Sequence, residues 1–150
     1  MSYIISSDPE FSQLLAPRSL QAAREVRRDS ALRRARTCYH HLAGIAGVSL
    51  LDEMLSRGWF NTEQGEKTLY RLTSPGERSL LKLGVDAPGA ASQRRPFAYG
   101  CLDWTERRYH LRGSLADAIL TAMAYSGAVN RTTGTRAVSL KGPVSDWFDL

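Results

Sequence analysis

The stretch CYHHLAGIAG, residues 38–47, and the stretch RRYHLRGSLAD, residues 107–117, both contain the order His-Leu-x-Gly. A cysteine precedes each of them, Cys38 in the first stretch and Cys101 upstream of the second. Two explanations are open at this point. The cysteines and histidines form a metal or catalytic site, or the chain contains a duplicated structural unit.

An alignment of the chain with itself supports a duplication. His41 matches His110 and Gly58 matches Gly127, in each case 69 residues apart, and four further pairs match at the same offset. Pro75 then matches Pro143 at an offset of 68. Matches at a nearly constant offset through several elements indicate an internal repeat, so the repeated motif is at least partly architectural.

The residue pattern between these landmarks predicts the elements of each copy. Apolar residues at three- and four-residue steps predict helices over 19–46, 48–57, 102–111 and 114–126. Alternating stretches around a glycine turn predict hairpins over 59–73 and 128–140. The order helix–helix–hairpin–helix is most of a winged helix. We therefore expect an α+β, mostly helical fold of two tandem winged-helix-like repeats, residues 31–88 and 89–150, that pack together.

The N-terminal residues 1–30 are predicted to contain a short strand and a linker helix. Phe11, Leu14 and Leu15 would lie on one face of a helix over 9–15, and this face is predicted to contact a second chain in a homodimer. There is no signal peptide at the start, and no apolar run approaches the length of about 20 residues that spans a membrane. A cytoplasmic location without a membrane partner is expected.

The charge of the chain is carried by arginine. The formal net charge is +5, and 17 of the 20 basic residues are arginines. Arginine suits phosphate partners, so contacts to the DNA backbone are one interpretation and a solvated helix face is the other. The candidate backbone contacts are Arg24, Arg27, Arg28, Arg33, Arg34 and Arg36.

Two longer blocks resemble a known family. RRARTCYHHLAGIAGVSLLDEMLSRGWF, residues 33–60, and the block around CLDWTERRYHLRGSLADAIL, residues 101–120, are similar to the C-terminal half of a subgroup of bacterial ArsR-type winged-helix transcriptional regulators. His40 departs from the pattern, because the subgroup usually has an acidic residue there. The resemblance implies the dimerisation and effector-sensing part of a DNA-binding regulator, whose usual recognition helix would lie upstream of Met1. The alternative is a stand-alone basic DNA-binding protein.

Two cysteines and two histidines form a candidate metal site. Thiolate and imidazole groups are good ligands for zinc and other thiophilic metals, and the two copies could bring them together. The alternative is that the cysteines are inert core residues beside core histidines. The four candidate ligands are Cys38, His41, Cys101 and His110.

A third group of residues is a candidate effector pocket. In a helix, Asp103, Glu106 and His110 would share one face and could act in acid–base chemistry, or could form ion pairs of Asp103 with Arg107 and of Glu106 with His110. No set of complementary catalytic roles can be assigned, so no enzyme activity is predicted. Aromatic residues near them could bind a small organic effector or could simply fill the core. The candidate pocket residues are Tyr39, Trp104, Asp103, Glu106 and Tyr109.

Overall fold

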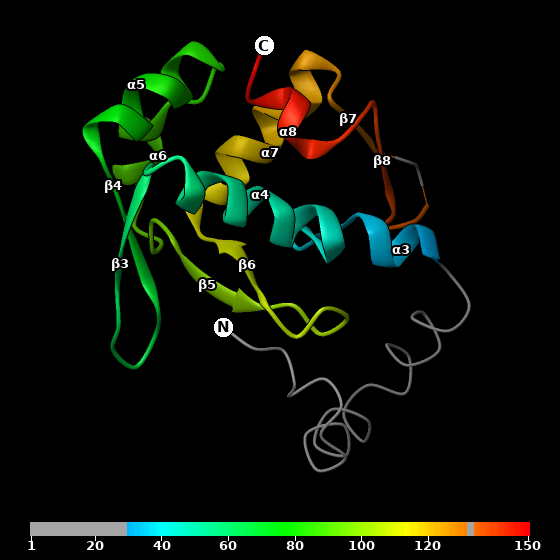
Figure 1. Ribbon diagram of the computed structural model, residues 1–150, viewed down its shortest axis with the longest axis horizontal. Coiled ribbons are helices and arrows are strands. Elements are labelled where there is room, and N and C mark those ends of the chain that lie inside the picture. Colours follow the sequence, from blue (N-terminus) through cyan, green and yellow to red (C-terminus); the bar gives the residue numbers. More distant parts are fainter. Residues whose placement is uncertain (1–29, 132–133) are drawn as a thin grey trace.

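A computed structural model describes residues 30–131 and 134–150, and these contain six helices and eight strands (Figure 1). No helix in these two ranges combines the length and the apolar character needed to cross a membrane. In chain order the elements are α3 (Ser30–Arg34), β1 (Arg36–Cys38), β2 (His41–Ala43), α4 (Gly44–Ser56), β3 (Phe60–Glu63), β4 (Leu69–Leu72), α5 (Ser74–Lys82), α6 (Ala87–Ala91), β5 (Tyr99–Leu102), β6 (Tyr109–Arg112), α7 (Ser114–Ser126), β7 (Val129–Arg131), β8 (Val138–Leu140) and α8 (Val144–Trp147).

The order of these elements repeats, but the unit is not a winged helix. Each half reads hairpin, long helix, hairpin, helix: β1 to α5 in the first half, and β5 to α8, after α6, in the second. The predicted helices before α4 and before α7 are wrong, because these segments form the hairpins β1–β2 and β5–β6. The prediction of a mostly helical fold of winged-helix-like repeats is therefore also wrong.

The reason for the error lies in two glycines. Gly44 and Gly113 have φ angles of +76° and +118°, which L-residues with a side chain rarely adopt. They separate the preceding strand from the long helix, so α4 and α7 each begin directly after a hairpin. A short apolar run that precedes such a break fits a strand as well as a helix, and periodicity alone does not distinguish the two.

The later elements agree with the predictions. Helix α7 and the hairpins β3–β4 and β7–β8 lie where they were expected. Helix α4 covers most of the predicted helix 48–57, but it begins at Gly44 and continues through Gly47, where a break was predicted. The short helix α6 follows α5 and precedes the second half. The structure describes residues 30–46 of the predicted helix 19–46, and of these only α3 and the start of α4 are helical. The predicted strand and the helix 9–15 lie outside the described residues, and the domain boundary at 88/89 stays a prediction.

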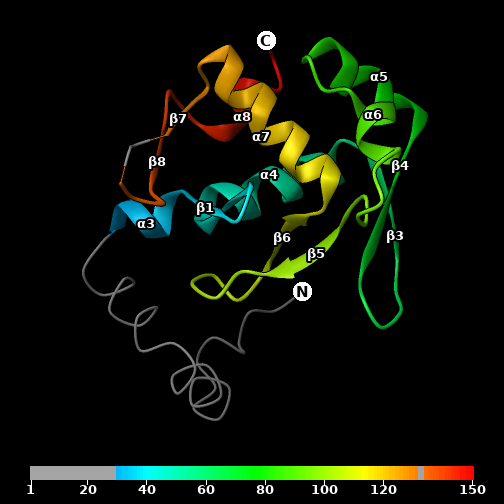
Figure 2. The ribbon, with the colours of Figure 1, turned by 180° about the vertical axis from the view of Figure 1, so that it is seen from behind.

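The eight strands form three antiparallel sheets, and the largest of these connects the two halves. β3, β4, β5 and β6 make one four-stranded sheet, and Leu69 of β4 faces Tyr99 of β5 across the join between the halves. β1–β2 and β7–β8 are separate hairpins. An antiparallel bridge between Arg36 and Ala137 links the first hairpin to the last (Figure 2).

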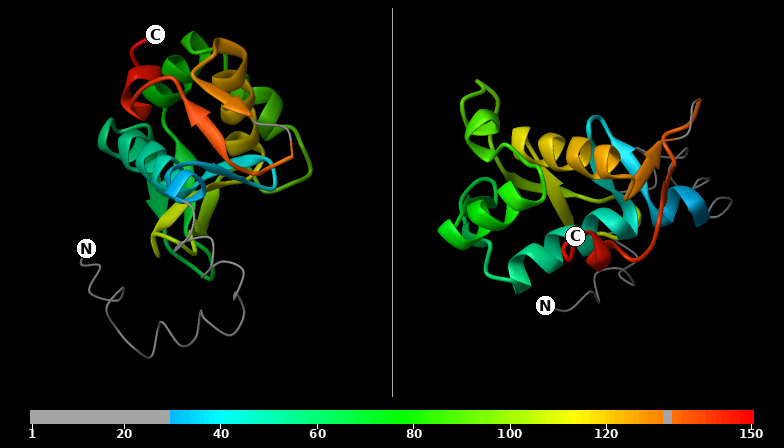
Figure 3. Two further views of the ribbon diagram at one scale, coloured as in Figure 1. Left: turned by 90° about the vertical axis from the view of Figure 1, so that its right-hand side faces the viewer. Right: turned by 90° about the horizontal axis from the view of Figure 1, so that it is seen from above.

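The long helices hold the two halves together. α4 packs mainly on β6, and α7 packs on β2, so each helix covers a strand of the other half (Figure 3). Both helices bury most of their apolar residues in one core. Gly47 allows the close approach of α4, because a Cβ atom there would lie 2.4 Å from the Leu42 carbonyl oxygen and 3.3 Å from the His110 Cβ.

One ion pair lies inside this core. Arg36 Nη2 donates to Asp103 Oδ1 at 2.8 Å, and the two side chains are 1% and 0% exposed. Arg36 Nη1 donates to the Leu32 carbonyl and to Thr105 Oγ1, and the Trp104 ring lies 4.1 Å from the guanidinium carbon. The pair fixes β1 of the first half to the loop after β5 of the second.

We expect the substitution Arg36→Met to destabilise the fold by about 3–5 kcal/mol, because it leaves the Asp103 carboxylate buried without its cation. Urea unfolding followed by circular dichroism measures this loss. Arg71→Met is the matched control, since Arg71 pairs with Glu63 on the exposed surface of the β3–β4 hairpin. Equal unfolding midpoints for the two variants would contradict the structural importance of the buried pair.

Candidate functional site

Four side chains that can bind metals meet where the hairpins β1–β2 and β5–β6 face each other. Cys38 and His41 come from the first hairpin, and Cys101 and His110 come from the second. Their ligand atoms all lie within 4.8 Å of one another. The two histidines are almost fully buried, and the two cysteines are half-buried. The structure thus brings together all four residues of the predicted metal set.

Strand register explains why each hairpin contributes one cysteine and one histidine. Cys38 is the cross-strand partner of His41 in β1–β2, and Cys101 is the partner of His110 in β5–β6. Cross-strand partners in an antiparallel pair project from the same face, with their Cβ atoms close together. The different loop lengths hide this equivalence in the sequence, where the cysteines are 63 residues apart and the histidines 69.

Turn geometry completes the two hairpins. The first hairpin closes through the two residues Tyr39 and His40, and Tyr39 adopts a left-handed φ of 57°. The second closes through a longer loop in which Asp103 Oδ2 accepts hydrogen bonds from Thr105 Oγ1 at 2.7 Å and from the Glu106 amide at 2.9 Å. The Asp103 side chain therefore organises the loop that leads into β6.

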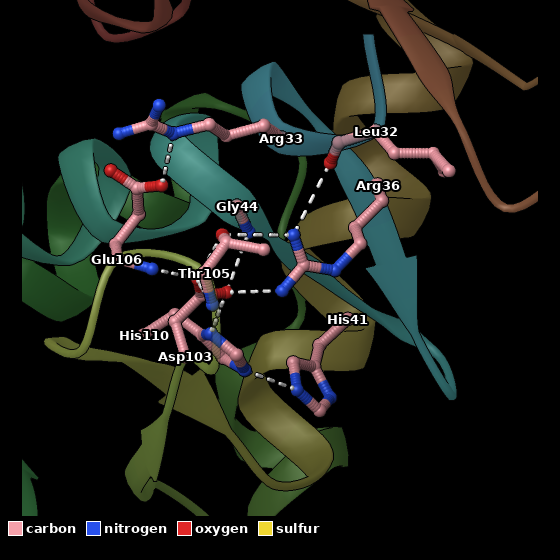
Figure 4. Close-up of polar contacts among 9 residues, drawn as sticks. All are labelled: Leu32, Arg33, Arg36, His41, Gly44, Asp103, Thr105, Glu106 and His110. Carbon is pink, nitrogen blue, oxygen red and sulfur yellow. Dashed lines mark hydrogen bonds and ion pairs between the residues drawn. The ribbon is translucent and has the colours of Figure 1, made fainter. Parts of the chain in front are cut away.

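The other carboxylate oxygen of Asp103 connects this loop to the cluster. Oδ1 accepts hydrogen bonds from Arg36 Nη2, from the Gly44 amide at 2.8 Å and from His110 Nδ1 at 3.1 Å (Figure 4). Burial opposes ionisation of Asp103. The hydrogen bond from His110 and the charge of Arg36 outweigh it, so the pKa of Asp103 lies below its usual value. Asp103 is thus an ionised acceptor for His110.

This contact orients the two histidines. With Nδ1 of His110 donating to a carboxylate, its Nε2 faces the centre of the cluster, 3.0 Å from Nε2 of His41 (Figure 4). Burial disfavours the charged imidazole, but hydrogen bonding to Asp103 and to Cys38 raises the pKa of His110 above its usual value. Two ring nitrogens at this distance need either a shared proton or a cation between them.

The cysteines differ in acidity. A hydrogen bond from Cys101 lowers the pKa of Cys38 against the effect of burial, and the two histidines lower it further. Conversely, the hydrogen bond to Cys38 and burial raise the pKa of Cys101. Of the two thiols, Cys38 is therefore the more acidic. Thiolates are the form of cysteine that binds metals and reacts.

Several predicted pairings around Asp103 are wrong. Residues 103–110 form a loop and the start of a strand, so Asp103, Glu106 and His110 do not share a helical face. The carboxylate of Asp103 pairs with Arg36 instead of Arg107, and that of Glu106 pairs with Arg33 instead of His110. Asp103 and His110 do meet, through the hairpin.

The predicted effector-pocket residues are not all gathered around the pocket that Tyr39 borders. Tyr39 borders an open pocket of about 330 Å³, which is also lined by His41, Tyr99 and Arg112. Trp104 stacks on Arg36 away from it. Asp103 forms a buried ion pair, Glu106 forms an ion pair at the surface, and the ring of Tyr109 is half-exposed.

The predicted DNA-contacting arginines differ in their exposure to solvent. Arg36 is buried against Asp103, so it cannot contact a phosphate group, and that prediction is wrong. Arg33 and Arg34 are exposed on α3. Arg24, Arg27 and Arg28 lie outside the described residues.

Comparison with known proteins gives one relative. No family model and no solved structure matches the chain. The chain is 33% identical over 127 residues to YdfF of Bacillus subtilis strain 168, whose name describes it as an uncharacterised HTH-type transcriptional regulator. The match takes in 84% of this chain and 55% of YdfF, so the chain spans about half the length of the relative that it matches. This similarity supports a relation to transcriptional regulators, and it carries no statement about the ArsR type or about a ligand.

Proposed function

We propose that this chain is the effector-sensing and dimerisation part of an ArsR-like transcriptional regulator that acts in the bacterial cytoplasm. Support comes from the two sequence blocks that resemble that group and from the similarity to YdfF. The observation that carries the proposal is the buried group of ionisable side chains between the two halves. Such groups destabilise a core unless they are paired, and they are concentrated at functional sites.

The position of the cluster suits a sensor. Its four side chains come from two hairpins that belong to different halves and contact each other through β2 and β6. A ligand that binds groups from both hairpins would favour one arrangement of the halves over others, which is how an effector shifts a conformational equilibrium. A DNA-reading element elsewhere in the regulator could respond to that shift.

The long helices argue against DNA reading by the described residues. A recognition helix places polar side chains in the major groove. In α4 and α7 the apolar faces are buried against strands of the other half. The charged residues of α4 are Asp52 and Glu53, which are partly exposed and carry the same sign of charge as a phosphate backbone. Base-specific readout is therefore assigned to a different part of the regulator or to a partner.

The 150-residue chain is expected to bind DNA weakly and without sequence preference, through its arginines. A mobility-shift titration against its own promoter and against a scrambled duplex should give affinities that differ by less than tenfold, about 1.4 kcal/mol, and that fall steeply with salt. A larger preference for the promoter at moderate salt would favour the alternative of a stand-alone DNA-binding protein.

Transcription in the source bacterium tests the regulatory role. Deletion of the gene should change transcript levels of neighbouring genes, and the wild-type gene should restore them. We expect the double variant His41→Ala and His110→Ala to restore basal levels without restoring the response to the inducing condition, because it removes the centre of the cluster. His40→Ala, one residue away and exposed, is the matched control. Unchanged transcripts in the deletion strain would contradict the proposal.

A further inference from the structure

The cluster between the two hairpins has the composition of a soft-metal site. Two thiol groups and two imidazoles are the Cys₂His₂ set that binds Zn²⁺ with tetrahedral geometry, whereas Ca²⁺ and Mg²⁺ prefer oxygen ligands. Cys38 and Cys101 are the two cysteines of the chain, and both lie in the cluster. Random placement of two cysteines in 150 residues would rarely bring both beside a pair of buried histidines.

The distances already approach those of a tetrahedral site. Zinc bonds of about 2.0–2.1 Å to nitrogen and about 2.3 Å to sulfur place two nitrogen ligands about 3.3 Å apart and two sulfur ligands about 3.8 Å apart. In this chain the two histidine Nε2 atoms are 3.0 Å apart, and all four ligand atoms lie within 4.8 Å. Small side-chain adjustments would be enough to surround an ion.

Charge supports the same conclusion. A dication with two thiolates and two neutral imidazoles is neutral overall, which lowers the desolvation penalty of a buried charge. The cation also replaces the contact between the ring nitrogens of His41 and His110, each of which would then direct a lone pair at the ion.

A positioning shell surrounds the ligands. Histidine ligands of metals usually donate their other ring N–H to a carboxylate or a carbonyl group, which fixes the tautomer and the ring orientation. His110 makes this contact through Nδ1 to Asp103, which Arg36 and the Gly44 amide hold in place. These hydrogen bonds hold the His110 ring on one side of the site.

A route to the cluster exists from the surface. His41 lines the open pocket of about 330 Å³ together with Tyr39 and Arg112. Because Cys38 and Cys101 are half-buried and His41 borders this pocket, a bound ion could exchange with solvent. A sensor requires such exchange, whereas a fully enclosed structural site does not allow it.

From these observations we infer that Cys38, His41, Cys101 and His110 bind one thiophilic divalent metal ion, such as Zn²⁺, which cross-links the first hairpin of one half to the first hairpin of the other. This names the ligand class of the effector site proposed above. Its test uses metal binding by the purified chain, so it can succeed or fail whether or not the chain regulates transcription.

Cobalt substitution tests the inference directly. The full chain is treated with reductant and chelator, freed of both under anaerobic conditions and titrated with Co²⁺. One equivalent should give the intense visible bands of four-coordinate Co²⁺ and a thiolate-to-cobalt charge-transfer band, and Zn²⁺ should abolish both. The double variant Cys38→Ser and Cys101→Ser should lose the charge-transfer band, because no thiolate remains. Each single serine variant should weaken that band, His110→Ala should bind Co²⁺ more weakly, and His40→Ala should keep the bands in full.

Two results would overturn the inference. One is a folded, reduced wild-type chain that shows only the pale spectrum of hydrated Co²⁺. The other is retention of the charge-transfer band at full intensity by the double serine variant. Thiol alkylation of the wild-type chain gives a readout that depends on no variant. Zn²⁺ should slow the labelling of both cysteines by about tenfold or more, because metal binding competes with other reactions of the thiolate. Addition of a chelator should restore the original labelling rate. A labelling rate that Zn²⁺ does not change would also overturn the inference.

The positioning role of Asp103 has a separate test. Asp103→Asn should weaken Zn²⁺ binding by about 10–100-fold in a competition with a chromophoric chelator, the usual effect of losing an outer-shell carboxylate. Its Co²⁺ complex should keep the charge-transfer band, because the four ligands remain. Glu106→Gln, in the same loop but paired with Arg33 on the surface, is the control. Circular dichroism first establishes that each variant is folded. If Asp103→Asn, Glu106→Gln and the wild type then bind Zn²⁺ with equal affinity, the positioning role is refuted.

Discussion

The buried Asp103 carboxylate is the contact on which the rest of the structure depends. Its two oxygens receive hydrogen bonds from the loop that it belongs to, from the start of α4, from His110 and from Arg36 of β1. These donors come from both halves of the chain. An isolated buried carboxylate is very unfavourable, so the fold is compatible with this residue only if all the donors are in place. Local loop geometry, inter-half packing and the orientation of the site are thereby set by one side chain.

The duplicated order of elements explains why the site forms at the centre of the molecule. Equivalent hairpins face each other, and equivalent histidines meet with their Nε2 atoms in contact. A duplication that packs in this way places two copies of the same residue near a common axis, so a single Cys–His hairpin pair becomes a four-residue cluster. The two hairpin loops differ in length, and among the described residues the Asp103 loop is present only in the second hairpin.

The sequence predicted the long helices, the later hairpins and the identity of the four clustered residues, because these depend on local periodicity, on the matched glycines and on residue chemistry. It did not predict that the segments around His41 and His110 are strands. Strands of three and four residues carry too short a pattern to identify, and their pairing depends on contacts with the rest of the fold. The partner of Asp103 was missed for the same reason, since Arg36 lies 67 residues away along the chain. Arg36 belongs to an arginine-rich run of the sequence. Nothing in that run distinguishes this buried arginine from the others.

The bridge between Arg36 and Ala137 bears on how the chain folds as it is synthesised. Because α7 also covers β2, the hairpin β1–β2 obtains these neighbours only after residue 137 has been made. Until then the Arg36 guanidinium has no Asp103 to contact and stays hydrated, and the apolar face of α4 lacks β6. Contacts of such high sequence separation close late and slow folding. The contacts between the halves that form the shared site therefore also mean that the first half can complete its folding only after the second half has been synthesised.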